Sequence, residues 1–151
     1  MWVQLYAGLM FEADTFDHKA SELKDMRDIS LMNFYSGIGT CISKDKTDFT
    51  PALYVTWQSL DEDIDESFDV FGEVLTKTKT NQRARIVRAI ENSKAGIKNE
   101  LITGGKQTIK YGGISSKSGD NNYMYRVQGL EYYKFLDDVS AKLDSDPSYV
   151  I

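Results

Sequence analysis

The sequence predicts an α+β fold of two layers, in which helices pack on an antiparallel sheet that is incomplete in this chain. Segments near both ends of the chain carry apolar residues at the spacing of a helix face. Only two segments, residues 34–43 and the stretch from residue 51, alternate their side chains with the period of strands. A two-stranded hairpin alone is marginally stable in water. We therefore expect either that the helices cover the hairpin or that a longer protein supplies further strands.

The composition is typical of one soluble globular domain. The 151 residues include 41% hydrophobic and 27% charged side chains, and a chain of this length can bury roughly two-thirds of its unfolded surface. A formal charge of −5 argues against a nucleic acid or an anionic membrane as partner. No basic residue precedes Lys19, and no apolar run approaches the ~20 residues that cross a bilayer. We therefore expect a cytoplasmic protein.

Two helices are expected before the first strand. The first begins at the start of the chain without an N-cap residue, as in a cut through a larger protein, and its apolar face comprises Trp2, Leu5, Tyr6 and Leu9. A polar break at residues 14–17 separates it from a second amphipathic segment. That segment covers residues 20–26, and residues 29–33 are expected to extend it with a bend.

The two strands are expected to form a hairpin. One face of residues 34–43 carries Gly37 and Gly39, which indicates a bulge or a close approach to the backbone. Residues 44–48 are a polar loop, and the second strand opens at Pro51, a position where proline is tolerated. A loop of this length joins antiparallel neighbours.

The rest of the chain is expected to be helical. A helix over 64–79 begins after an acidic run, in which Asp63 and Glu66 have the spacing of a capping box. Its apolar face comprises Ile64, Phe68, Phe71 and Leu75. A long helix from about residue 80 has its apolar face at Ile86, Ile90, Ile97 and Leu101. After the Gly104-Gly105 break, residues 109–111 are expected to resume a helix. The last helix carries Tyr132, Leu136, Val139 and Leu143 and stops at Asp146-Pro147.

Several motifs suggest chemistry, but a structural interpretation explains each of them better. Residues 103–108 are not a phosphate loop, because Glu100 and Gln107 occupy positions that need glycine and a hydroxyl residue. The acidic run 61–66 lacks the glycine and terminal glutamate of a calcium loop. An aromatic cluster can line a peptide-binding surface or form core, and it comprises Tyr123, Tyr125, Arg126, Tyr132 and Tyr133.

His18 and Cys41 are the only histidine and the only cysteine of the chain. One histidine cannot build a zinc site of two or three imidazoles, and one cysteine excludes an intrachain disulfide. The two could form a nucleophile–base pair, although they stand 23 positions apart without a flanking signature. We predict no catalytic residue, no metal ligand and no cofactor-binding residue.

Stretches along nearly the whole chain resemble one protein family, in matching order. Residues 34–39 (FYSGIG) are similar to a Tyr-Thr-Gly-Gly-Ile-Ser segment, although Ile38 separates the two glycines. Residues 64–79 and 82–101 resemble a helix pair, including the run 94–101 and the ITGG of residues 102–105 after it. The first helix with residues 16–28 resembles the helix, turn and helix that precede the Tyr-Thr-Gly-Gly segment. Residues 128–136 (QGLEYYKFL) are similar to a Gly-Leu-x-Tyr-x-x-Phe-Leu segment. The family is the presequence-protease-like branch of the pitrilysin/insulinase zinc metallopeptidases, which includes falcilysin.

This resemblance implies that residues 1–151 form a single domain, a fragment of the first domain of the peptidase's C-terminal half. In this family two halves close around a chamber that holds the peptide. The N-terminal half carries the zinc motif His-x-x-Glu-His, and the C-terminal half is non-catalytic. The implied partners are the other domains of the parent and the enclosed peptide, with zinc in the N-terminal half and no cofactor here. Residues 18–22 hold a His and a Glu but not this motif, so no catalytic residue is carried over.

Two alternatives remain open from the sequence. The chain could be a complete small α+β interaction domain that dimerises through a strand edge. A small hydrolase that uses Cys41 and His18 is the third hypothesis.

Overall fold

A computed structural model describes residues 1–45, 48–104 and 112–146 and confirms the α+β class. Its elements in chain order are α1 (Trp2–Leu9), α2 (Ala20–Ser30), β1 (Met32–Ile42), β2 (Phe49–Gln58), the 3-10 turn η1 (Asp61–Asp63), α3 (Ile64–Lys77), α4 (Arg83–Thr103), α6 (Gly119–Gln128) and α7 (Leu130–Ser145). The helix expected at residues 109–111 lies outside the described residues.

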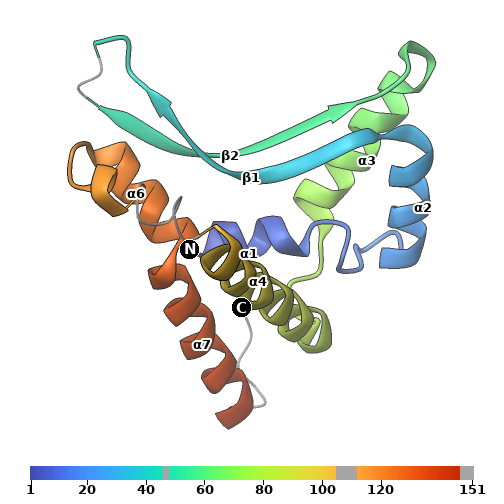
Figure 1. Cartoon of the computed structure of the whole chain (residues 1–151). Helices are drawn as coiled ribbons and strands as arrows, with labels where there is room; N and C mark the ends of the chain where they lie inside the picture. Colours follow the sequence, from blue (N-terminus) through green and yellow to red (C-terminus); the bar gives the residue numbers. More distant parts are fainter. Residues whose placement is uncertain (46–47, 105–111, 147–151) are drawn as a thin grey trace.

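α1, α2, α4, α6 and α7 lie on one side of the sheet and α3 runs past one end of it, so the molecule has two layers (Figure 1). β1 and β2 pair antiparallel, and the described residues contain no third strand in this sheet. α1 lies beneath the hairpin, α2 and α3 lie near one end of it, and α6 lies near the other (Figure 1). The sheet is therefore covered on one face and open at its edges, as the sequence predicts.

The apolar residues form two clusters rather than one. The first joins α1, α4 and α7, and its buried members are Leu5, Leu9, Ile86, Ala89, Ile90, Tyr132, Leu136, Val139 and Leu143. The second joins the end of α1 to α2, α3 and the inner face of the sheet, and its buried members are Met10, Phe11, Leu23, Leu31, Val70, Phe71 and Val74. Phe11 belongs to this cluster with a positive φ of 61°. One cluster thus packs helices against each other, and the other packs helices against the sheet.

The glycines of β1 accommodate a tyrosine from β2. The pair Gly37 and Tyr54 lies directly across the hairpin, with Gly39 opposite Ala52. A Cβ at Gly39 would lie 3.1 Å from the Tyr54 ring, and one at Gly37 would lie 3.3 Å from its hydroxyl oxygen. The close approach expected at these glycines is confirmed, and an aromatic ring fills the space that a side chain would take.

Some predicted boundaries are wrong because tertiary contacts override local pattern. Of residues 29–33, only Ile29 and Ser30 extend the second helix: α2 ends at Ser30, and β1 begins at Met32. The Asn33 side-chain Nδ2 donates to Gln58 Oε1 over 2.8 Å, and Met32 pairs with Gln58. Pairing with β2 therefore draws these residues into the strand.

The expected capping box at Asp63 is also wrong. Asp63 belongs to η1 and makes no side-chain bond to the start of α3. α3 ends at Lys77 instead of residue 79, because the Lys79 amide donates to the Asp14 carbonyl over 2.8 Å. Its last turn thus joins the loop between α1 and α2.

Candidate functional site

The exposed side of the first turns of α3 and the last residues of β2 form an apolar groove. It is lined by Val55, Thr56, Trp57, Gln58, Ser59, Ile64 and Phe68, with a volume of about 490 Å³. The sequence places Ile64, Phe68 and Leu75 on the core face of α3, but these residues are 46%, 58% and 41% exposed. Of the predicted face, only Phe71 is buried. The residues that replace them in the core are Ser67, Val70 and Val74. α3 therefore has one apolar face in the core and a second on the surface.

Trp57 supports this groove from the sheet. Its indole nitrogen donates to Ser67 Oγ over 3.1 Å, and Ser67 donates to the Ile64 carbonyl over 2.6 Å. The Trp57 ring packs edge-on against Phe68 at 5.2 Å and lies 4.3 Å from the Phe71 ring. The buried serine thus anchors the tryptophan, and Phe68 extends the ring cluster into solvent. We name this surface, residues 55–59 with Ile64 and Phe68, the β2-edge groove.

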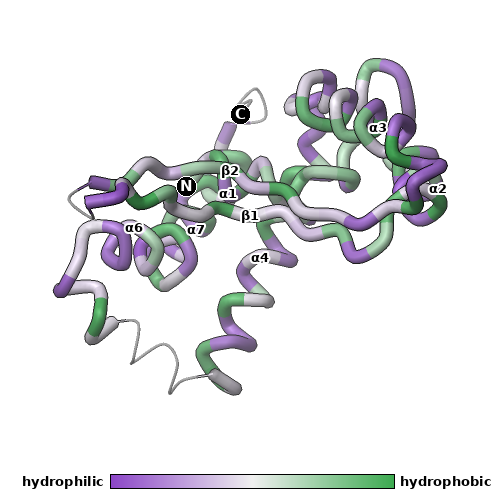
Figure 2. The backbone as a smooth tube through the Cα atoms, turned by 90° about the horizontal axis from the view of Figure 1, so that it is seen from above, coloured by the Kyte–Doolittle hydropathy of each residue, from purple (hydrophilic) through white to green (hydrophobic). Residues whose placement is uncertain are grey.

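The outer face of the sheet is a second open surface. Seen from above, no described helix crosses in front of the middle of the hairpin (Figure 2). Tyr35 and Tyr54 lie here with ring centroids 5.7 Å apart, and they are 56% and 37% exposed. A hydrogen bond with Tyr35, then partial burial, raises the pKa of Tyr54 to about 12. The two rings form a surface pair, and the Tyr54 phenol stays protonated at neutral pH.

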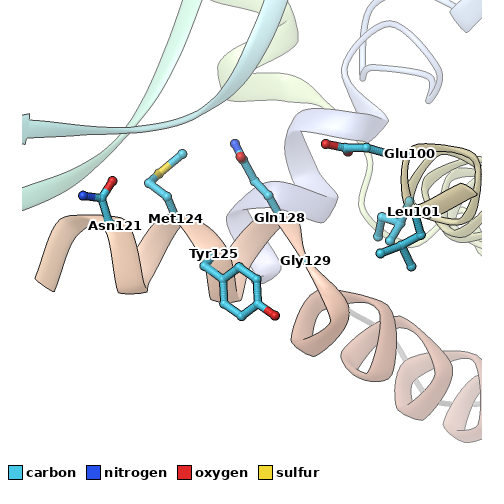
Figure 3. Close-up of a pocket in the computed structure, with 8 residues that line it drawn as sticks. Glu100, Leu101, Asn121, Met124, Tyr125, Gln128 and Gly129 are labelled. Carbon is cyan, nitrogen blue, oxygen red and sulfur yellow. The ribbon is translucent and has the colours of Figure 1, made fainter. Parts of the chain in front are cut away.

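A third surface is a cleft of about 240 Å³ between α4 and α6. It is lined by Ile97, Glu100, Leu101, Asn121, Met124, Tyr125, Gln128 and Gly129. The Glu100 carboxylate points toward α6, from which Met124 and Gln128 project on the facing side (Figure 3). Half of the apolar face predicted for α4, Ile86 and Ile90, is buried in the first core cluster. The other half lines this cleft.

The chain is similar to one known family. The family model that matches residues 1–139 describes a segment associated with peptidases of family M16, subfamily C. The chain belongs to this peptidase-associated family. No curated protein matches the chain. The resemblance to the pitrilysin-type M16 peptidases is therefore confirmed at the level of the family. Membership indicates a non-catalytic part of a larger M16 peptidase that has other domains.

His18 in this peptidase-associated chain holds two elements together. Its Nδ1 lies 2.9 Å from both carboxylate oxygens of Glu73 on α3. The Thr15 hydroxyl, 1% exposed, also donates to Glu73. Hydrogen bonding to Glu73, reinforced by its charge, raises the pKa of His18. Asp17 and Lys77 add an ion pair of 2.6 Å beside it. We name this cluster of Thr15, Asp17, His18, Glu73 and Lys77 the clasp. It links the α1–α2 loop to the last turns of α3.

The structure does not bring His18 and Cys41 together as a catalytic pair. His18 is engaged with Glu73, whereas Cys41 is exposed in the last part of β1. Among residues 1–45, 48–104 and 112–146, no three His, Cys, Asp or Glu side chains lie together as a metal site. With one histidine in the whole chain, these residues do not fit the zinc centre of an M16 peptidase. None of the described helices has both the length and the apolarity to span a bilayer.

The aromatic residues over 123–133 do not share one role: some belong to the core, and others lie on a surface or line a cleft. Tyr132 is 3% exposed in the first core cluster, and burial raises its pKa to about 12. Tyr123 packs on Phe49 of β2 at 5.9 Å. Tyr125 lines the cleft between α4 and α6. Helical spacing alone could not separate these roles, because α6 and α7 are distinct helices that meet at Gly129.

Proposed function

We propose that this chain is a non-catalytic, chamber-forming segment of a presequence-protease-like zinc endopeptidase that degrades short unfolded peptides. In this proposal, residues 1–151 are a single domain and part of the first domain of the C-terminal half. Zinc and the residues that activate water belong to the N-terminal half. This chain supplies wall surface and contacts to the peptide. A cytoplasmic location is part of the proposal and is consistent with a single cysteine.

The observation that carries the proposal is the open sheet beside an exposed apolar groove. In an antiparallel pair, half of the backbone N–H and C=O groups of each strand point away from the partner. The outer groups of β2 therefore have no strand partner among the described residues, and residues 55–58 of the same strand line the β2-edge groove. Monomeric proteins rarely leave such an edge next to large apolar side chains. Phe68 at 58% exposure and Ile64 at 46% are explained if a strand from another part of the parent docks here.

The clasp, and the pair Tyr35 and Tyr54 packed over Gly37 and Gly39, also support the proposal that this chain forms part of a chamber wall. Both fix surface shape without placing a nucleophile, a base or a metal ligand in a cavity. The family membership supports the presence of a larger parent protein, because a segment of this family is associated with a peptidase. The presequence-protease-like branch is supported by the resemblance of segments along the chain, residues 34–39 and 128–136 among them.

A substitution in the β2-edge groove tests the docking role. We expect Phe68→Asp to leave the isolated chain folded, because the side chain is largely exposed. The same variant should weaken association with the separately expressed remainder of the parent polypeptide by at least about tenfold, measured by titration calorimetry, as for a central apolar anchor. The matched control is Ile102→Asp on α4, which is 73% exposed and outside the groove. Equal loss in both variants would contradict the docking role.

Activity measurements test the non-catalytic role. The purified chain should not hydrolyse an unfolded fluorogenic peptide, with or without added zinc. The reading frame that precedes it should encode His-x-x-Glu-His. Zinc-dependent hydrolysis by the chain alone, or a gene without that motif, would contradict the proposal.

A stand-alone interaction domain is the second candidate. The helical core of α1, α4 and α7 favours it, because it packs without using the sheet. In this case the chain would dimerise through its strand edges, and sedimentation would show a dimer that Phe68→Asp dissociates. A monomer that binds the rest of the parent favours the first candidate.

A further inference from the structure

The cleft between α4 and α6 has one charged group in an otherwise neutral lining. Ile97, Leu101 and Met124 supply apolar surface, and Asn121, Gln128 and Tyr125 supply neutral polar groups. Glu100 is the single charged residue among those that line it. In the described part of the chain, its carboxylate has no ion-pair or hydrogen-bond partner. The unpaired charge gives the cleft a chemical preference.

The size of the cleft limits what can enter it. Its volume of about 240 Å³ is below the range of about 300–1,000 Å³ that encloses a drug-sized molecule. One long side chain fits this space better than a whole small ligand. Lysine and arginine combine an apolar stem with a cationic head, and such side chains pack their stems on apolar surface while the head reaches a polar rim.

We propose that the α4–α6 cleft is a subsite for one lysine or arginine side chain of an extended peptide. The stem packs on Leu101, Met124 and Ile97, and the head meets the Glu100 carboxylate. Gln128 projects on the same side as Met124 (Figure 3), so its amide oxygen is available as a second acceptor. This inference rests on the proposed function, because it takes a peptide as the ligand, and it adds a preference for basic side chains.

The charge argument separates this cleft from the β2-edge groove. That groove is lined only by apolar and neutral side chains and suits an apolar segment. The chain as a whole carries −5, which adds a weak general attraction for cationic peptides. A control substitution must therefore remove the same charge elsewhere on the same helix. Glu91 is exposed on α4 and does not line the cleft.

The experiment compares two peptides of identical length and flexible sequence. One contains a single arginine, and the other contains citrulline, which has the same shape without the charge. Binding to the chain is followed by fluorescence anisotropy. An exposed ion pair changes an affinity by about two- to fivefold, so we expect the arginine peptide to bind more tightly by this factor. Glu100→Gln should abolish the difference, Glu100→Asp should retain part of it, and Glu91→Gln should preserve it.

Methyl NMR locates the binding site. The arginine peptide should shift the Met124 methyl signal, while Met10, which is 4% exposed in the second core cluster, should stay unshifted. Equal affinity for both peptides, or equal effects of Glu100→Gln and Glu91→Gln, would overturn the subsite and leave the proposed function standing. No binding of either peptide would contradict both the subsite and the peptide-contact role. A Met124 shift that depends on protein concentration without peptide would assign the cleft to a second copy and overturn the proposal.

Discussion

His18 and Glu73 stand 55 positions apart in the sequence, yet the imidazole Nδ1 lies 2.9 Å from both carboxylate oxygens. The carboxylate accepts hydrogen bonds only, so Nδ1 is assigned as the donor. The same carboxylate accepts the Thr15 hydroxyl, whose oxygen also accepts the His18 amide over 2.9 Å. At the scale of the residue, this histidine is a structural link between a loop and a helix, not a base beside Cys41.

The clasp makes stability depend on pH. Because Glu73 raises the pKa of His18 in the folded chain, the folded state holds the proton more tightly than the unfolded state does. The contribution of His18 to stability is therefore fully present below its unfolded pKa of about 6.5. It is lost as the pH rises through the raised folded pKa. We expect the wild type to lose stability relative to His18→Gln as the pH rises from about 6.5 through the raised folded pKa, measured by urea unfolding at each pH.

The wild type and His18→Gln must be compared at the same pH, because the Met1 amino group also titrates within this pH range. Burial lowers the pKa of the Met1 amino group, which changes stability in the opposite direction over part of this range. The NMR titration of the single imidazole should give a folded pKa above that of the urea-unfolded chain. A folded value at or below the unfolded one would show that the clasp does not form.

At the scale of the element, Gly129 separates α6 from α7. Its amide donates to the Tyr125 carbonyl over 2.9 Å and ends α6, while its own carbonyl accepts the Tyr133 amide and begins α7. A Cβ here would lie 2.6 Å from the Tyr125 carbonyl oxygen. Backbone atoms cannot yield as a flexible side chain can, so the junction requires glycine for close approach and not for a positive φ.

Alanine substitutions should distinguish this glycine from one with free space. Gly129→Ala should lower the free energy of unfolding by about 1–3 kcal/mol, since α6 must shift its last turn. Gly96→Ala, inside α4 with no atom within 4 Å of the added Cβ, should raise it by about 0.5–1 kcal/mol through lower entropy of the unfolded chain. Urea unfolding measures both. Equal effects of the two substitutions would refute the steric argument at the junction.

α3 shows why the sequence located the element but not its faces. The spacing of Ile64, Phe68 and Leu75 correctly predicted a helix, because a 3.6-residue period follows from backbone geometry. It named the wrong inward face, since Ser67 and Val70 also recur at helical spacing and are the residues that are buried. Trp57 selects between the faces by donating to Ser67. That partner comes from another element, so a local pattern could not reveal it.

At the scale of the whole molecule, two apolar clusters support different parts. The α1–α4–α7 cluster encloses Leu5, Ile90 and Leu136, each at most 1% exposed. The described helices cover the inner face of the sheet, and none of them covers the middle of its outer face (Figures 1 and 2). Local stability should therefore differ between the helical core and the hairpin.

Hydrogen exchange should show this difference in the isolated chain. Amides in the middle of α1, α4 and α7 should exchange more slowly than the paired amides of β1 and β2, because a two-stranded sheet with open edges opens more readily. Binding of the rest of the parent should slow exchange mainly in β2. Equal protection of sheet and helices in the isolated chain would favour the stand-alone interaction domain instead.

The sequence alone determined the α+β class, the antiparallel hairpin, the approximate place of the described helices other than α6, and the family. These depend on local periodicity, on turn residues and on motif order, all of which a single chain displays. The sequence did not predict α6 as a helix of its own. The tertiary structure decided that His18 meets Glu73, that Tyr54 lies over Gly37 and Gly39, and that Glu100 faces α6 across a cleft. Each of these depends on residues distant in sequence, whose approach is set by how two apolar clusters pack.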